Sequence, residues 1–123
     1  MAGNDNQVFI NKHGVIEIKV CGDQTVSSVQ AMGDEAIRLA TKIRQSHQPA
    51  LILDNLLEMG EVPVEARKRV AELVKSSDYD KLAMLGSGTL LKLGANLILQ
   101  ATGRGAHVRY FDNRTEAIDW LMR

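Results

Sequence analysis

Residues 50–74, ALILDNLLEMGEVPVEARKRVAELV, are the stretch that decides the fold. The nearly continuous apolar run at residues 50–57 is typical of a strand that is covered on both faces of a sheet. A loop follows, and Pro63 lies near the first turn of a predicted helix that extends to about Ser77. A buried strand that leads through a loop into a helix predicts a parallel sheet with helices packed on it.

The same pattern extends along the rest of the chain in both directions. We expect strands at residues 8–10, 15–22, 50–57, 81–86 and 107–112, and helices at residues 25–47, 63–77, 90–102 and 113–123. The turn NKHG, which ends in Gly14, joins the first two strands as a hairpin. The order β-β-α-β-α-β-α-β-α predicts an α/β fold whose mixed sheet is mostly parallel, with one antiparallel partner.

Two of these elements show their buried faces by periodicity. The strand at residues 15–22 alternates, with one face formed by Val15, Glu17, Lys19 and Cys21 and the other by Ile16, Ile18 and Val20. The first helix repeats its apolar residues at helical spacing, at Val29, Ala36, Ile37, Ala40 and Ile43. Gly33 fits the same face and predicts close packing there, while Thr25 and Asn113 (or Thr115) are candidate helix caps.

Length and composition limit the class of protein. A chain of 123 residues fits one domain over residues 1–123, of which we expect the polar residues 1–7 to be flexible. Fifteen basic residues balance fifteen acidic ones, so the charge gives no indication of nucleic-acid binding. Cys21 is the only cysteine, the N-terminus lacks a secretory signal, and no apolar run approaches the ~20 residues of a membrane span. We therefore expect a cytoplasmic protein.

A second informative stretch is residues 107–121, HVRYFDNRTEAIDWL, a strand that leads into a helix with Ala117, Trp120 and Leu121. Together with residues 50–74 it resembles the STAS superfamily, the fold of anti-sigma-factor antagonists, and more closely its SpoIIAA-like branch of small bacterial proteins. The resemblance extends over nearly the whole chain. It implies a non-enzymatic regulatory or protein-interaction module with a regulatory protein as partner.

The sequence departs from that superfamily at one functional position. In anti-sigma-factor antagonists, a serine at the start of the helix after the central strand is phosphorylated by the partner kinase. Here no Ser or Thr occurs between Asp54 and Lys75. A phosphoserine switch at this place is chemically impossible without a hydroxyl group.

The loop and helix start after the central strand face a partner in the antagonist family. The resemblance therefore favours a partner-binding surface made of Asp54, Glu58, Met59, Gly60, Glu61, Val62, Pro63 and Glu65. Asp54 is predicted to end the strand, at the carboxyl edge where α/β folds often place functional carboxylates. The alternative is that the acidic residues only complement the dipole of the helix that follows.

The turn Gly86-Ser87-Gly88-Thr89 is a candidate anion site. A Gly-rich turn between a strand and a helix directs backbone N–H groups outward, and Lys92 lies one turn into the predicted helix. The spacing matches neither the Walker A motif nor the dinucleotide fingerprint. A tight turn closed by a capping Thr89 explains the same residues without any ligand.

The predicted helix at residues 90–102 is apolar on more than one face, unlike an ordinary surface helix. Burial between its own neighbours, a homodimer interface and a small apolar ligand all account for this pattern. We expect a homodimer. The alternative function is a binder of a small apolar or anionic ligand, such as a lipid or nucleotide, in a cavity lined by Leu91, Ile98 and Leu99.

Neither a metal site nor a catalytic set is expected. The three histidines, His13, His47 and His107, have no metal-ligand spacing. Cys21 has no activating base nearby in the sequence and fits an inert, half-buried position. We therefore predict no cofactor and no enzymatic activity.

Overall fold

Strand β3 (Leu51–Met59) lies at the centre of a five-stranded sheet with the order β1-β2-β3-β4-β5. The computed structural model describes residues 5–88, 103 and 107–123. The other elements are β1 (Gln7–Ile10), β2 (Ile16–Gly22), α1 (Val26–Gln45), α2 (Val64–Ser76), β4 (Lys81–Leu85), β5 (Val108–Phe111) and α4 (Arg114–Met122). Strand β1 is antiparallel to β2 and the other neighbours are parallel, which confirms the predicted α/β fold and its mixed sheet. The predicted helix at residues 90–102 lies outside the described residues.

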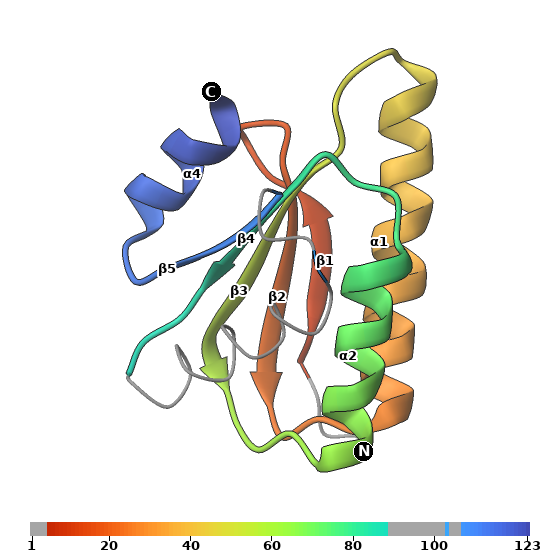
Figure 1. The fold of residues 1–123 in the computed structure, drawn as a ribbon, viewed down its shortest axis with the longest axis vertical. Coiled ribbons are helices and arrows are strands. Elements are labelled where there is room, and N and C mark those ends of the chain that lie inside the picture. The colour runs from red at the N-terminus through yellow and green to blue at the C-terminus, as the bar shows by residue number, and fades with distance from the viewer. Residues whose placement is uncertain (1–4, 89–102, 104–106) are drawn as a thin grey trace.

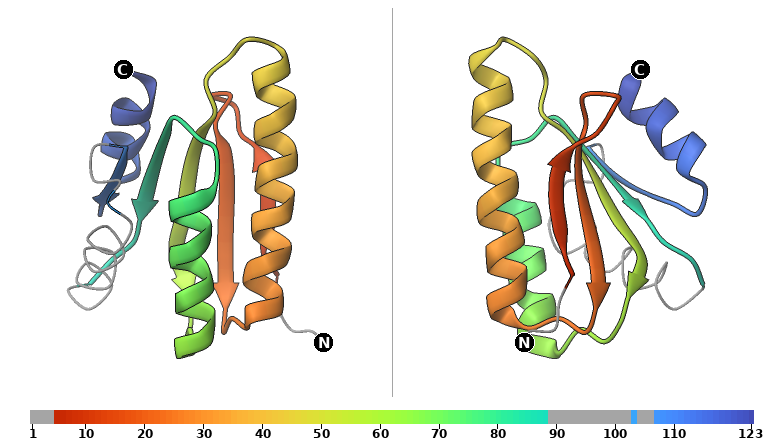
Figure 2. Two further views of the ribbon diagram at one scale, coloured as in Figure 1. Left: turned by 45° about the vertical axis from the view of Figure 1, so that its right-hand side comes forward. Right: turned by 180° about the vertical axis from the view of Figure 1, so that it is seen from behind.

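Helices α1 and α2 cover one face of the sheet and α4 covers the other (Figures 1 and 2). The face under α1 and α2, here called the helix-pair face, buries Ile16, Val20, Ile52, Leu82 and Met84. The α4 face buries Val15, Leu53, Ala83, Leu85 and Leu121. The predicted alternation of β2 is confirmed, because Ile16 and Val20 lie on the helix-pair face and Glu17 lies on the α4 face, where it is hydrogen-bonded to Arg114.

The predicted turn and caps have the expected geometry. Gly14 has a φ of 76°, and the Asn11 side chain accepts hydrogen bonds from the backbone N–H groups of His13 and Val15 at 2.9 and 3.2 Å. Thr25 caps α1 by accepting from the N–H of Ser28, and Asn113 caps α4. Local sequence thus fixes the hairpin and two helix starts.

Helix α1 packs closely on α2, as Gly33 predicted. A Cβ atom at Gly33 would lie 2.9 Å from Leu73 Cδ1, so only glycine allows this approach without a shift of Leu73. The prediction for Ile37 was wrong, because its side chain is 43% exposed. Burial instead reaches Met32 and Leu39, whereas Ile37 borders a cavity between the helices and the sheet.

The central strand is longer than its apolar run predicted. It continues to Met59, so Asp54 lies in the middle of β3 and does not end it. The prediction that Asp54 lies at the carboxyl edge of the sheet was therefore wrong. The register with β2 and β4 continues past Asp54, which pairs with Ile18 on one side and Met84 on the other.

Candidate functional site

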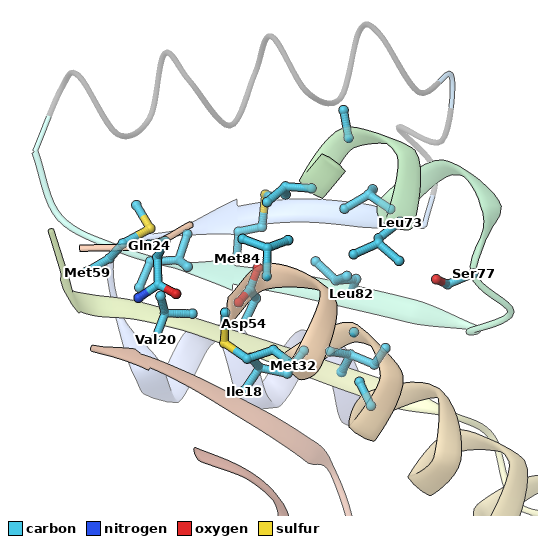
Figure 3. Close-up of a pocket in the computed structure, with 18 of the residues that line it drawn as sticks. Ile18, Val20, Gln24, Met32, Asp54, Met59, Leu73, Ser77, Leu82 and Met84 are labelled. Atoms are coloured by element: carbon cyan, nitrogen blue, oxygen red, sulfur yellow. The ribbon is translucent and has the colours of Figure 1, made fainter. Parts of the chain in front are cut away.

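A cavity of about 1050 Å³ lies on the helix-pair face, between the sheet and helices α1 and α2. Its lining comes from helices α1 and α2 and strands β2, β3 and β4, and Figure 3 shows side chains such as Met32, Asp54 and Leu73 directed toward it. Its apolar lining includes Ile18, Val20, Ile52, Leu56, Leu82, Met84, Met32 and Leu73. We call it the helix-side cavity. Its walls are apolar, as in most small-molecule sites, and its volume is close to the upper limit of such sites, which measure roughly 300–1,000 Å³.

Asp54 projects from β3 into the helix-side cavity (Figure 3). No residue that the structure describes forms a hydrogen bond or an ion pair with its carboxylate, and desolvation alone raises its pKa to about 7. The side chain keeps some accessible surface because it borders the cavity, although the protein shields it from bulk water. The sequence identified Asp54 as a candidate, but for a surface role.

Two loops that are hydrogen-bonded to each other line one end of the helix-side cavity. The N–H of Gly60 donates to the carbonyl of Gly22 at 2.8 Å, and the N–H of Gln24 donates to the carbonyl of Glu61 at 2.8 Å. The N–H of Glu61 also donates to Asp23 Oδ1 at 2.8 Å. A Cβ atom at Gly60 would collide with Asp23 Oδ1 and with the Gly22 backbone. The loop after β3 is therefore held in one position.

The structure brings together most of the predicted partner surface. Glu58, Gly60, Glu61, Pro63 and Glu65 are exposed at the carboxyl edge of the sheet. Met59 and Val62 are half-buried and, together with Gly60, contribute to the cavity lining. Asp54 is separate from this group, because its side chain faces the cavity interior. The role of these residues in binding a partner stays a prediction.

Glu58 differs from the other acidic residues of that surface in having a cation beside it. Its carboxylate lies 3.2 Å from Lys19 Nζ, on the neighbouring strand β2. The Glu58 side chain is 61% exposed and that of Lys19 is 36% exposed, so water screens the pair and it contributes little to stability. Glu61 and Glu65 remain as the acidic residues most suited to a partner contact.

The Gly-rich turn also reaches the helix-side cavity. The N–H of Gly86 donates to the carbonyl of Phe111 at 3.0 Å, so this glycine extends the pairing of β4 with β5. Ser87 and Gly88 are exposed and border the cavity, and Gly88 has a φ of 90°. Thr89 and Lys92 lie outside the described residues, as do Leu91, Ile98 and Leu99, so binding of an anion here stays a prediction.

The opposite face of the sheet carries a polar cluster that the sequence did not reveal. Glu17 is 4% exposed, and both its oxygens accept from the Arg114 guanidinium, at 2.7 and 3.0 Å. Asn11 and Asn55 each donate to it at 3.2 Å. The Arg114 hydrogen bonds are the largest cause that lowers the pKa of Glu17 to about 2. This cluster connects the start of α4 to β2 and β3.

The described ranges hold neither a metal-ligand cluster nor a membrane-spanning helix. Residues 5–88, 103 and 107–123 contain no group of three or more His, Cys, Asp or Glu side chains that could hold a metal ion. No helix in this part of the chain is long and apolar enough to cross a membrane. Cys21 is half-buried, as the alternation of its strand predicted.

Comparisons with known proteins agree with this architecture. A family model described as SpoIIAA-like matches residues 15–122. A solved structure of an uncharacterised protein of the DUF3478 family with a SpoIIAA-like fold, from Shewanella loihica PV-4, is similar with a TM-score of 0.67. The two chains are 17% identical, and the match covers 98% of this chain and 95% of the other. A search of curated proteins finds no match.

Proposed function

Because this chain belongs to the SpoIIAA-like family, a fold used for regulation and protein interaction, we propose that it is a non-enzymatic binding module. It would bind a small, largely apolar molecule in the helix-side cavity. The alternative predicted from the sequence was also a ligand binder, but in a cavity lined by Leu91, Ile98 and Leu99, which lie outside the described residues; the helix-side cavity is a different candidate place. The usual phosphoserine has no counterpart here, so the ligand would supply the signal that phosphorylation supplies elsewhere in the superfamily.

The observation that carries this proposal is the apolar cavity itself. A ligand that covers its walls would remove apolar surface from water, at roughly 25 cal/mol for each Å². Two features favour a preformed site: the loop around Gly60 is fixed by backbone hydrogen bonds, and the sheet forms a rigid floor. A preformed site binds more tightly because little has to be ordered on binding.

The chemistry of the cavity favours binding over catalysis. A covalent mechanism needs a nucleophile and a base at hydrogen-bond distance, with a third group to orient them. Asp54 is the carboxylate of the cavity interior, and no described residue provides a nucleophile or orienting donor within that distance of it. We therefore keep the prediction that the chain is not an enzyme.

The test is a titration of the protein with Nile red, a neutral apolar dye, followed by fluorescence. Wild type should give saturable binding of one dye molecule. Ala71 lines the helix-side cavity from α2, and Ala71→Phe should weaken binding at least about tenfold by filling it. Ala31 is exposed on α1 outside the lining, so Ala31→Phe is the matched control and should bind like wild type. Equal binding by both variants would contradict the proposal.

A partner protein at the loop after β3 is the second candidate function. The fixed position of this loop favours it, together with the exposed carboxylates of Glu61 and Glu65 and the exposed Val64. Glu61→Lys with Glu65→Lys should abolish capture of a partner that wild type retains, whereas Glu72→Lys on the far part of α2 should not. Equal capture by the two variants would remove this surface from consideration.

The proposed homodimer depends on residues 90–102, outside the described part of the chain. Native mass spectrometry of the gently purified protein reports subunit count and bound small molecules together. A dimer would support the interface that the apolar pattern of residues 90–102 predicts, and a monomer with added mass would support the ligand alone.

A further inference from the structure

We propose that the ligand of the helix-side cavity carries a protonated amine on an apolar body, and that Asp54 is the residue that recognises this amine. The inference rests on the proposed function, because it names the chemical class of the molecule that the cavity takes up. It assigns Asp54 a binding role inside the cavity and not at the partner surface.

The first step is the position of Asp54 in the sheet. It pairs in register with Ile18 on β2 and Met84 on β4. Along β3, the residues on the same face are Ile52 and Leu56, which are buried. The carboxylate therefore occupies a central place in the floor of the cavity, with apolar side chains on every side of it within the sheet.

The second step is the free energy that it costs to place an ionised carboxylate at that position. An ionised carboxylate that leaves water without a partner loses a large hydration energy, and proteins normally bury one only with donors around it. Glu17, on the next strand, has such donors. Asp54 has none among the described residues, and its raised pKa reports the unfavourable environment of the charge. A ligand that brings a donor removes this cost.

The third step is the choice of head group. An ammonium group forms charge-assisted hydrogen bonds with a carboxylate, and these are roughly twice as strong as neutral ones. The low dielectric of an apolar cavity strengthens the attraction further. A carboxylate head group would instead meet a like charge, and a hydroxyl group would form only one hydrogen bond without an opposite charge.

The other charged residues that line the helix-side cavity do not compete for this place. Arg44 Nη2 lies 3.1 Å from Asp78 Oδ1 and 3.0 Å from Asp80 Oδ2, so the charge of Arg44 is already balanced, although its buried Nε has no hydrogen-bond partner among the described residues. Arg67 and Lys68 are exposed on α2, where water and salt screen their charges. Asp54 is therefore the charged residue that is best placed to contact an amine in the interior of the helix-side cavity.

The test compares octylamine, octanol and octanoic acid, three probes with the same chain length, as competitors of Nile red at pH 8. Wild type should bind octylamine at least about tenfold more tightly than the other two, since one charge-assisted bond is worth about that factor. Asp54→Asn keeps the shape of the side chain but removes the charge, so it should bind the three probes within about twofold of one another. Asp119→Asn, at an exposed position on α4, is the matched control and should keep the preference.

The possible results separate the two proposals. Displacement of Nile red by all three probes with equal affinity would overturn the amine inference and leave the cavity function intact. Tighter binding of octanol or octanoic acid, or an unchanged preference in Asp54→Asn, would overturn it as well. Failure of the protein to bind Nile red and all three probes would overturn the proposed function together with the inference.

Discussion

Glu17 and Asp54 lie on neighbouring strands, β2 and β3, and on opposite faces of one sheet. Glu17 receives four hydrogen bonds from Arg114, Asn11 and Asn55. Asp54 receives none from the described residues, and its surroundings are apolar. The pKa of Glu17 is lowered to about 2, whereas that of Asp54 is raised to about 7. The α4 face therefore uses its carboxylate to hold the fold together, and the helix-pair face leaves its carboxylate available to a ligand.

The largest expected effect is a pH dependence of stability that depends on Asp54. Its pKa is higher in the folded state than its ordinary value of 3.8, so the folded protein binds this proton more tightly than the unfolded chain does. Stability should consequently fall as pH rises from about 4 to about 7, by on the order of 4 kcal/mol. Urea denaturation across this range should show the fall in wild type, and the difference from Asp54→Asn isolates its contribution. If the free energy of unfolding changed with pH in the same way in the two proteins, the proposed difference between Asp54 and Glu17 would be contradicted.

The second-largest expected effect is a loss of stability when the Glu17 cluster on the α4 face loses Arg114. Arg114→Ala would leave Glu17 buried without its main partner, and we expect a loss of about 3 kcal/mol, because removal of one partner of a buried pair costs roughly 3–5 kcal/mol. Arg114 is itself 47% exposed, which favours the lower figure. Arg38→Ala, which breaks an exposed pair with Glu35, is the control and should cost less than about 1 kcal/mol. Equal losses in the two variants would show that the Glu17 cluster is no stronger than a surface pair.

A third change tests how firmly the end of the helix-side cavity is held. Gly60→Ala places a methyl group against the Gly22 backbone and Asp23, which are not free to move aside, so we expect a loss of about 2 kcal/mol. Gly33→Ala is the contrasting variant, because its methyl group meets the flexible end of Leu73 and the helix gains an alanine. Thermal unfolding should separate the two. A Gly60→Ala protein as stable as wild type would mean that this loop adapts.

The smallest effect concerns a single donor of the Glu17 cluster. Asn55→Ala removes one hydrogen bond to Glu17, while Arg114 and Asn11 remain, and it also removes the acceptor of the Leu57 N–H at 3.2 Å. We expect a loss of about 1 kcal/mol by urea denaturation, because both hydrogen bonds are long and each contributes at the low end of the usual range of roughly 0.5–1.5 kcal/mol. Thr41→Ala, which removes an exposed hydroxyl on α1, should change stability by less than about 0.5 kcal/mol. A loss as large as that of Arg114→Ala would mean that the cluster acts as a unit.

Features with short-range causes were predictable from the sequence. The hairpin at Gly14, the caps Thr25 and Asn113, and the close packing at Gly33 each depend on a residue type and its immediate neighbours. The alternation of β2 was predictable because the two faces of a strand repeat every second residue. The resemblance to the SpoIIAA-like family depended instead on residues 50–74 and 107–121, and the family model supports it over residues 15–122.

Features that depend on distant partners were not predictable. The main partner of Glu17 could not be predicted, because Arg114 follows 97 positions later in the chain. The length of β3 could not be predicted from its apolar run. Its last residues continue the strand although Glu58 is exposed and Met59 is half-buried. The place of Asp54 in a cavity followed only from the packing of α1 and α2 across the same face.

The contrast between the two carboxylates depends on one quantity, the pKa of Asp54. It can be measured by following the carbon-13 shift of its side-chain carboxyl in a pH titration of the folded, ligand-free protein by nuclear magnetic resonance, assigned with Asp54→Asn. We predict a pKa of about 7, and a lower value once octylamine is bound. A value near 3.8 in the free protein would show that the carboxylate is already solvated or paired, and would contradict the ligand role proposed for it.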